Sequence, residues 1–429
     1  MSGTRLFDVL ACAALAPARL AAQTTSPARS PSLTIAQAVD EAVARNLSLF
    51  AERANLSIAD AATITARLRP NPVFSFSADH LDVLGTHFDT TNNGGPTEIA
   101  TRIDVPIERG GKREARILVA SIARSAAEAQ LADFVRVLKQ DVTLACIDFL
   151  AAKATRELVS DNLRTFQELA RVNAARAKAG SIAPFESIRS DVAMLQFRST
   201  VVRAELDLAA ATARLRTLLG RPPAAPVDIT DRLGPAAALA VEDVAPLEQL
   251  ALLSRPDLQA LRQTEARTTA DLRLQEAIGK IDYTIGAEYR RQEGVSGRSN
   301  SLGLFFSAPL PFSNRNQGEI ARAAAEHEGT ARQIAARRAQ IVAEVRTAYQ
   351  EYVTTRDLVA EMERDLLEPA TSAREISAYT YRAGGSTLLE LLDAQHAFND
   401  TMQGYLDAQA SLRRAASHLN AAVASEVVP

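Results

Sequence analysis

Residues 106–149 read PIERGGKREARILVASIARSAAEAQLADFVRVLKQDVTLACIDF, and residues 309–352 read PLPFSNRNQGEIARAAAEHEGTARQIAARRAQIVAEVRTAYQEY. The second segment keeps the chemistry of the first at a spacing of 203 positions. The matching pairs are Pro106/Pro309, Lys112/Arg315, Ile117/Ile320, Leu131/Ile334, Leu138/Ile341, Val142/Val345, Ala145/Ala348 and Phe149/Tyr352. At a spacing of 204, four further pairs follow: Gly180/Gly384, Glu186/Glu390, Leu208/Leu412 and Leu215/Leu419. A period of about 200 residues is far longer than a solenoid repeat and predicts two copies of one complex unit.

The duplication divides the chain into a first unit at residues 31–220 and a second at residues 247–429. A connector rich in proline and alanine, residues 221–246, joins them. Residues 1–30 are expected to be an export signal, cleaved near Ala22, or a disordered N-terminus. Because the run before Cys12 also resembles a lipoprotein cleavage box, acylation of this cysteine stays open.

Composition excludes several classes of protein. The net charge of −3 over 429 residues does not favour nucleic acid as a partner. Two cysteines are too few for a disulfide framework, and Cys146 falls within a helical apolar stripe as a buried thiol would. No apolar run is long enough for a transmembrane helix, whereas the short, half-apolar strands of an outer membrane barrel remain possible. The sequence contains no paired nucleophile and base, phosphate loop or dinucleotide fingerprint, so we expect neither an enzyme nor a cofactor.

Each unit is expected to begin with a helix and a β-hairpin. Apolar residues recur with helical spacing over residues 33–68 and over residues 247–278. The period then changes to two, which predicts strands with one apolar and one polar face. On the apolar face we expect Phe74, Phe76, Ala78, Ile99, Thr101, Ile103, Val105, Ile281, Tyr283, Ile285, Ala287, Tyr289, Leu302, Leu304, Phe306 and Ala308. The two loops are marked by glycine and asparagine, with Gly294, Gly297 and Asn300 in the second.

A long helical hairpin follows each β-hairpin. Residues 112–178 contain no proline or glycine, and their apolar residues alternate at spacings of four and three from Leu131 to Phe149, as in a coiled coil. The counterpart covers residues 317–382, where we expect Pro369 to kink or loosen the helix. Glycine-containing turns lead into return helices at residues 183–219 and 387–424.

Four strands cannot close a membrane barrel, and open sheet edges are not tolerated in lipid. Three chains would supply twelve strands, enough for an aqueous lumen. The long helices exceed the thickness of a membrane and must project into water. The pattern therefore predicts an α+β membrane protein in which a trimer forms a 12-stranded β-barrel and a long α-helical coiled-coil barrel.

Four motifs, in this order along the chain, resemble the TolC family of outer membrane efflux proteins, in its heavy-metal CzcC-like branch. They are residues 69–72 (RPNP), 108–113 (ERGGKR), 309–318 (PLPFSNRNQG) and 383–395 (AGGSTLLELLDAQ). The resemblance extends over nearly all of residues 33–424. It implies a homotrimeric, passive exit duct in the outer membrane, with its helical barrel in the periplasm. It also implies a periplasmic adaptor (membrane fusion protein) and an inner-membrane RND pump as partners.

The motifs favour heavy-metal cations of the cobalt, zinc, cadmium and copper class as cargo. A drug-efflux channel and a type I secretion channel have the same fold and remain alternatives. A periplasmic coiled-coil interaction protein fits less well, because an adaptor would have one helical hairpin and not two copies.

The resemblance also suggests a gate and a docking site at the helical tips. Glu390 and Asp393 share a helix face past the second turn, where the family has an acidic pair. Six carboxylates in a trimer would attract cations, although a solvated helix face is the alternative. Glu186 is the first-unit equivalent of Glu390, but Ser386 stands where the family has an arginine for the salt bridge, and Arg189 or Arg382 is a candidate replacement. The expected adaptor-contacting tips are Gly180, Ser181, Gly384, Gly385 and Ser386.

Histidine and aspartate gather in the first hairpin loop, at Asp79, His80, Asp82, His87 and Asp89. Imidazole and carboxylate groups suit divalent cations, but the spacing matches no known metal cage and polar loops are usual in barrels. We therefore predict no metal site there. His327, His396 and His418 are scattered over helices and are expected to be structural.

Overall fold

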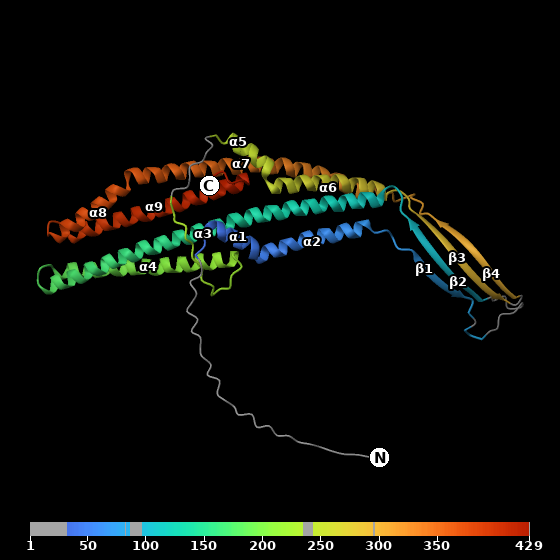
Figure 1. The fold of residues 1–429 in the computed structure, drawn as a ribbon, viewed down its shortest axis with the longest axis horizontal. Coiled ribbons are helices and arrows are strands. Elements are labelled where there is room, and N and C mark those ends of the chain that lie inside the picture. Colours follow the sequence, from blue (N-terminus) through green and yellow to red (C-terminus); the bar gives the residue numbers. More distant parts are fainter. Residues whose placement is uncertain (1–31, 82, 86–96, 235–242, 295–296, 429) are drawn as a thin grey trace, which may run out of the picture.

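The computed structural model describes residues 32–81, 83–85, 97–234, 243–294 and 297–428. Long helices form an elongated layer, and a four-stranded sheet extends from one end of it (Figure 1). The expectations for the export signal and for Cys12 concern residues outside the described part of the chain.

The described helices and strands occur in the same order in both units. In the first unit they are α1 (Ile35–Arg45), α2 (Leu47–Arg67), β1 (Val73–Asp79), β2 (Thr97–Ile107), α3 (Lys112–Lys178) and α4 (Pro184–Leu218). In the second they are α5 (Ala245–Ser254), α6 (Pro256–Ile278), β3 (Tyr283–Gly294), β4 (Gly297–Ser307), α7 (Gln317–Asp365), α8 (Leu367–Arg382) and α9 (Leu388–Val423). Each unit therefore consists of two helices, a β-hairpin and a helical hairpin, in this order.

The initial helix of each unit is in fact two helices, which corrects the single helices expected over 33–68 and 247–278. The first break falls at Asn46, whose side chain accepts a hydrogen bond from the amide of Leu49 and so caps α2. The second falls at Arg255, because Pro256 cannot donate to a preceding helical carbonyl and instead occupies the first turn of α6.

The outgoing helices differ in continuity. The first, α3, is one helix of 67 residues. The second is interrupted at Leu366, between α7 and α8. Pro369 lacks the N–H that would bond to the carbonyl four residues earlier, at Asp365, and its ring crowds that carbonyl. The predicted effect of Pro369 is confirmed.

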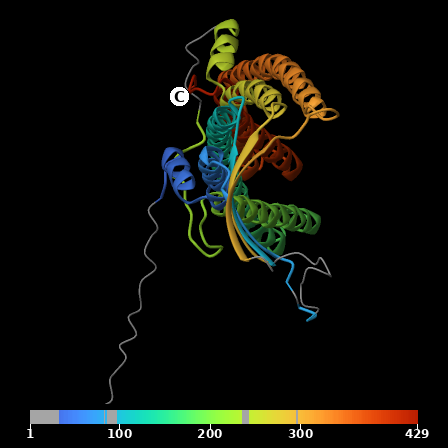
Figure 2. The ribbon, with the colours of Figure 1, turned by 90° about the vertical axis from the view of Figure 1, so that its right-hand side faces the viewer.

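The helical layer has a defined order at each end. Near the sheet, α3 lies between α2 and α6, and α6 packs on α7. Towards the tips, α3 lies between α4 and α9, and α9 packs on α7 and α8. The short helices α1, in blue, and α5, in yellow-green, lie on the same side of the layer as the C-terminus (Figure 2). The layer therefore has two edges, with α2 and α4 at one and α7 with α8 at the other.

The two β-hairpins join into one antiparallel sheet in the order β1-β2-β3-β4. Ile103 of β2 lies between Phe74 of β1 and Ala287 of β3, and Ala287 pairs with Leu304 of β4. The predicted apolar positions therefore share one face. Three details differ from expectation. β3 begins at Tyr283 and β4 ends at Ser307, so Ile281 and Ala308 lie outside the strands. Asn300 belongs to β4, because the strands continue to Gly294 and restart at Gly297.

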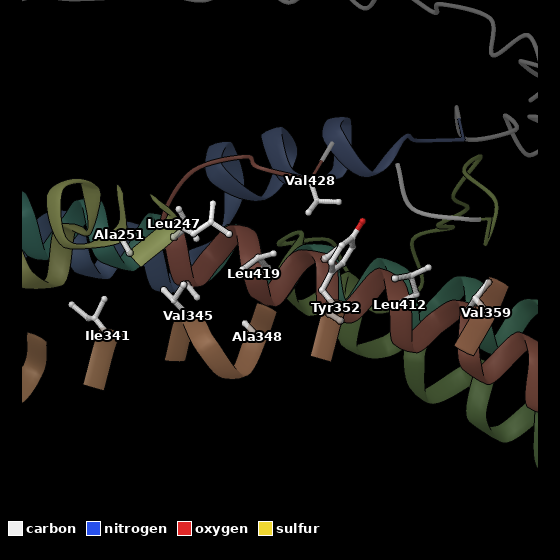
Figure 3. Close-up of a cluster of buried hydrophobic side chains, with 14 of the residues drawn as sticks. Leu247, Ala251, Ile341, Val345, Ala348, Tyr352, Val359, Leu412, Leu419 and Val428 are labelled. Carbon is white, nitrogen blue, oxygen red and sulfur yellow. The ribbon is translucent and has the colours of Figure 1, made fainter. Parts of the chain in front are cut away.

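Each unit has its own core. In the second, Ile341, Val345 and Tyr352 lie along α7 and pack with Leu412 and Leu419 of α9, and Leu247 and Ala251 of α5 join the same cluster (Figure 3). In the first, the repeat counterparts Leu138, Val142 and Phe149 of α3 pack with Leu215 of α4, beneath α1. The positions that defined the repeat are therefore the ones that bury the short outer helices.

Cys146 is fully buried within the first core, as predicted. Burial, with a smaller contribution from the charge of Asp231, raises the pKa of its thiol to about 12. The thiolate is therefore not populated at neutral pH, and the residue behaves as a small apolar side chain.

The described part of the connector runs back along α1. Ile229 forms an isolated parallel bridge with Leu33, and the Asp231 carboxylate accepts a hydrogen bond from the amide of Ile35. Arg221 forms an ion pair with Glu41 of α1. The connector thus binds the first unit on its outer side. Among the helices of the described segments, none combines the length and apolar character needed to cross a membrane.

Candidate functional site

Both helical tips end in the same turn. Gly180 has φ of 70° and Gly384 has φ of 80°, the left-handed region that glycine adopts without strain. The amide of Ser181 donates to the Arg176 carbonyl, and the amide of Gly385 donates to the Thr380 carbonyl. These are Schellman motifs, which satisfy the last carbonyls of α3 and α8. Turn geometry thus accounts for the glycines, and the adaptor contact expected of the tips remains a prediction.

The return helices begin differently. Pro184 starts α4, with no side-chain cap. In α9, Thr387 accepts from the amide of Glu390, and the Glu390 carboxylate accepts from the amide of Thr387. This capping box fixes the start of α9. Glu390 therefore has a structural task that the sequence analysis did not assign to it.

The three predicted gate residues lie on the surface of one protomer, and the structure does not bring them together. Glu390 and Asp393 are exposed on the first turns of α9, and Glu186 is half-buried on α4. Within the described residues no hydrogen bond or ion pair joins them. The expected replacements for the family's salt bridge do not form one in the protomer either: the guanidinium of Arg382 donates to the Ala378 carbonyl, and Arg189 has no described ion-pair partner.

Asp393 belongs to a longer acidic column on α9. Asp393, Asp400 and Asp407 repeat at heptad spacing and are all exposed, so they follow one side of a coiled-coil helix. Two further heptads along, Ala421 lines a cleft with residues of α3 and α7. The acidic column and this cleft therefore lie along the same side of α9.

The equivalent column on α4 has the opposite charge. Subtracting 204 from Asp393, Asp400 and Asp407 gives Arg189, Gln196 and Arg203. The two return helices thus occupy matching places with different electrostatics.

Aromatic side chains hold the two helical hairpins together near the tips. Phe166 of α3 stacks on Phe197 of α4 with 4.1 Å between ring centroids, and His396 of α9 stacks on Phe197 at 5.5 Å. The Tyr381 hydroxyl donates to the buried Asn173 amide oxygen at 2.8 Å. The structural role predicted for His396 is consistent with this contact. No sequence pattern indicated this cluster, because its residues come from four helices and periodicity describes one helix at a time.

The helix α4 carries two apolar stripes. One, including Ala193, Phe197 and Leu215, packs within the protomer. The other is exposed in the protomer and consists of Phe185, Ile188, Val192, Leu195, Val202 and Leu206. Spacings of three and four are the pattern of a coiled-coil seam, which the sequence analysis could have found. Exposed apolar residues also occur at the opposite edge, on α7 and α8, at Leu358, Ile376 and Tyr379.

The two faces of the sheet differ in chemistry. On the apolar face, Leu302 and Leu304 are 87% and 88% exposed, and Phe74 is 67% exposed. On the other face, Arg102 pairs with Asp104 and lies over the ring of Phe305 at 3.9 Å. An extended apolar face of this size is unusual on the surface of a soluble monomer.

The described histidines give no indication of a metal site. Asp79 and His80 lie at the end of β1, whereas Asp82, His87 and Asp89 lie outside the described residues. No group of three or more metal-ligating side chains occurs in the described ranges. His327 lies 3.3 Å from the Thr269 hydroxyl, and His418 lies 3.6 Å from the Glu351 carboxylate. Both contacts fit the structural roles that were predicted.

The sequence pattern of the outer membrane efflux protein family matches residues 38–221 and 247–425. The chain belongs to this family. Both repeats are included in the match, so the resemblance stated from four motifs is confirmed. Outer membrane efflux proteins are transport ducts, and the chain is accordingly not an enzyme.

Relatives of this outer membrane efflux protein agree with the assignment. The cobalt-zinc-cadmium resistance protein CzcC of Cupriavidus metallidurans is 25% identical over 388 residues, which are 90% of this chain and 89% of CzcC. The crystal structure of CusC has a TM-score of 0.74 at 17% identity and covers 92% of both chains. VceC from Vibrio cholerae has a TM-score of 0.72 at 16% identity, over 91% of this chain and 96% of VceC. The predicted fold class is confirmed.

Proposed function

We propose that three copies of this outer membrane efflux protein form a passive exit duct for heavy-metal cations. The sheets of the trimer make a 12-stranded barrel in the outer membrane, and the helical layers make a tube in the periplasm. A periplasmic adaptor docks on the tip turns, and an inner-membrane RND pump drives the cargo. The observation that carries the proposal is that one protomer has unpaired edges in both its sheet and its helical layer.

The helical edges support ring closure. The second apolar stripe of α4 is exposed in the protomer, and a helix with apolar residues on two sides needs a second partner. The edge formed by α7 and α8 also exposes apolar residues. Contact between two different edges is heterologous, and it closes into a ring when the rotation between copies allows it. The curvature of the layer in Figure 2 favours such a closed ring.

The sheet supports a location in the membrane. Its outermost strands, β1 and β4, have no second strand partner among the described strands. Pairing β4 of one copy with β1 of the next would satisfy these backbone groups, as lipid requires. The exposed apolar face would then meet lipid, and the ion-paired face would line the lumen.

The cargo proposal rests on the likeness to CzcC and on charge. We place the acidic column of α9 on the inside of the tube, and the short helices α1 and α5 on its outside. Three copies would contribute nine aspartates from Asp393, Asp400 and Asp407, in addition to Glu390 at the tip. Carboxylates lining a pore attract cations and exclude anions. The basic residues Arg189 and Arg203 on α4 reduce the negative potential of the aspartates and separate the acidic columns.

The gate is tested by removing charge without removing the cap. Glu390→Gln keeps a side chain that can complete the capping box, and Asp393→Asn keeps the shape of the neighbour. We expect the double variant to change single-channel conductance and to lower the preference for cations over anions in a planar bilayer, because the carboxylates no longer concentrate cations at the constriction. Asp40→Asn on the outer helix α1 is the matched control. Unaltered conductance and selectivity in the double variant would contradict the gate.

The cargo is tested by growth of a deletion strain. We expect lower tolerance to zinc, cobalt, cadmium or copper and restoration by the intact gene. Normal tolerance to all four metals, together with sensitivity to detergents, would instead indicate a duct for amphiphiles.

A further inference from the structure

The apolar face of the sheet ends near the helices in an aromatic and cationic contact. Tyr283 pairs with Ile107 at this end, and its ring lies 5.2 Å from that of Phe306. The guanidinium of Arg109 lies 4.5 Å from the centre of the Tyr283 ring and donates to its hydroxyl. At this end of the apolar face, Tyr283 therefore holds the positive charge of Arg109 beside the apolar surface.

Exposed apolar side chains extend the same end of the sheet. Phe312 and Leu310, in the turn between β4 and α7, are 83% and 70% exposed. Leu68, between α2 and β1, is also exposed. Together with Phe306 and Ile107 they continue the apolar surface beyond the last strand residues. Contiguous exposed apolar side chains of this kind mark a site of contact with a membrane or with another molecule.

The same turns contain an excess of basic residues. The segments are residues 67–72, 106–113, 278–282 and 308–317, and they meet at the base of the sheet. Their exposed basic residues are Arg67, Arg69, Arg109, Lys280 and Arg315. The acidic residues in these segments are Glu108 and Asp282, which pair with Arg116 and Lys112. A chain with a net charge of −3 thus concentrates uncompensated positive charge at this level.

Among the described residues, the arginines at the other end of the sheet have carboxylate partners within it. Arg290 pairs with Glu98, and Arg291 and Arg298 share Glu293. The charge asymmetry therefore distinguishes the helical end from the loop end. It is not a general property of the strands.

We propose that the helical end of the sheet is a belt that binds the headgroups of anionic phospholipids. The belt consists of Arg69, Arg109, Lys280, Arg315, Leu310 and Phe312. This inference rests on the proposed location of the sheet in a membrane. Arginine and lysine at the border of an apolar face reach lipid phosphates with their charged ends, while leucine and phenylalanine enter the acyl region. A site for free phosphate would account for the arginines but not for the exposed Phe312 and Leu310.

The absence of tryptophan from the sequence allows a local fluorescence measurement. Phe312→Trp places a single reporter in the belt, and Leu304→Trp places one in the middle of the apolar face. Each full-length variant is reconstituted into vesicles of equal parts phosphatidylglycerol and phosphatidylcholine. In one set the phosphatidylglycerol carries bromine on its acyl chains, and in the other the phosphatidylcholine does. Bromine quenches tryptophan only at short range, so the two sets report which lipid lies beside the reporter.

We expect the Phe312→Trp reporter to indicate about a fivefold preference for phosphatidylglycerol, since one basic residue near a membrane surface is worth about 1 kcal/mol. The Leu304→Trp reporter should be quenched equally in both sets. Adding Arg69→Gln, Arg109→Gln and Arg315→Gln should abolish the preference at the belt without changing quenching in the middle of the sheet. Inorganic phosphate should weaken the preference no more than chloride at equal ionic strength.

The outcomes separate this inference from the proposed function. Equal quenching of the Phe312→Trp reporter by both lipids, or loss of the preference with phosphate alone, would overturn the lipid belt. Quenching of the Leu304→Trp reporter without quenching of the Phe312→Trp reporter would place the belt outside the bilayer and would also overturn it, while leaving the barrel intact. If neither reporter is quenched, the sheet does not face lipid, and the proposed function fails with the inference.

Discussion

The two units have the same junction between a return helix and a short helix, but different side chains form it. In each, a return helix ends where a short helix leads into the layer, and one buried side chain bridges the two. In the first unit the side-chain amide of Asn46 donates to the Leu218 carbonyl at 2.9 Å. In the second, Arg255 donates to the Ala422 carbonyl, which is the position 204 residues after Leu218. One junction is therefore neutral, and the other is ionic.

The ionic junction needs several partners. The Arg255 side chain is 2% exposed and forms ion pairs with Asp257 and Glu344. Arg337 pairs with the same Asp257. A buried charge is tolerated only when ion pairs and hydrogen bonds replace its hydration. Asn46 needs no such network, so the first junction should tolerate substitution better than the second.

The largest effect is expected from Arg255→Ala. The substitution removes the buried partner of Asp257 and Glu344 and leaves both carboxylates with the less buried Arg337 alone, and breaking such a network costs about 3–5 kcal/mol. Urea denaturation of the purified protein in detergent, followed by helical circular dichroism, measures this loss. Arg273→Ala, on an exposed position of the same helix, is the control. Equal stability of the two variants would show that the ionic junction is not a stabilising element.

A smaller effect is expected where the return helices end. Gly220 and Ala424 are repeat counterparts with φ of 65° and 55°. Gly220→Ala should destabilise the first unit by about 1–2 kcal/mol from the backbone alone, and a Cβ would lie only 2.4 Å from the Arg45 carbonyl oxygen. Ala424→Gly should stabilise the second unit by up to about 1 kcal/mol, because glycine adopts this conformation without strain. Shifts of the denaturation midpoint in the same direction for both variants would contradict the comparison.

At the neutral junction, Asn46→Ala should cost about 1–2 kcal/mol through loss of the helix cap and of one buried hydrogen bond. Asn46→Ser retains an acceptor for the Leu49 amide but lacks the donor to Leu218, so an intermediate stability is expected. Asn55→Ala, on the exposed side of α2, is the control. If Asn46→Ala lost as much unfolding free energy as Arg255→Ala, the two junctions would not differ in their contribution to stability.

Protonation of Asp257 should have the smallest effect on stability at neutral pH and should destabilise one junction selectively in acid. Burial alone would raise the pKa of this carboxyl, but the hydrogen bonds and charges of Arg255 and Arg337 outweigh burial and hold the pKa well below its usual value. Because the folded pKa is depressed, the ionised carboxylate stabilises the fold above the unfolded pKa, near about pH 4. This stabilisation is lost as the pH falls from there towards the folded pKa.

Amide hydrogen exchange checks this expectation. Protection at the junction of α6 and α9 should decrease below about pH 4, after correction for the intrinsic pH dependence of exchange. Protection at the junction of α2 and α4 should follow a different course, because Asn46 does not titrate. An identical acid dependence at both junctions would assign the effect to the whole protein.

The two units also differ in the charge of the exposed residues on their return helices. The columns of α4 and α9 match in position but carry Arg189 and Arg203 on one helix and three aspartates on the other. The two copies share the geometry of a helical hairpin, and the charge difference between them gives their return helices different electrostatic fields. A perfectly symmetric chain would have one kind of column repeated six times in a trimer.

The sequence by itself determined the duplication, the order of elements and the faces of the strands. These follow from local patterns: a spacing of two fixes a strand face, and spacings of three and four fix a helix face. Pro369, within a long helical pattern, interrupts the helix because it lacks an N–H. The positions from Leu131 to Phe149 could be assigned to a core because their second copies, up to Tyr352, keep the same apolar pattern.

Only the tertiary structure decided which groups meet across the repeats. The amide of Asn46 and the guanidinium of Arg255 find carbonyls 172 and 167 residues away, and the Glu390 carboxylate is engaged by the cap of its own helix. The belt at the base of the sheet is likewise assembled from four separate turns. Periodicity describes one element at a time, whereas buried charges and surface fields depend on neighbours that only the folded chain brings into contact.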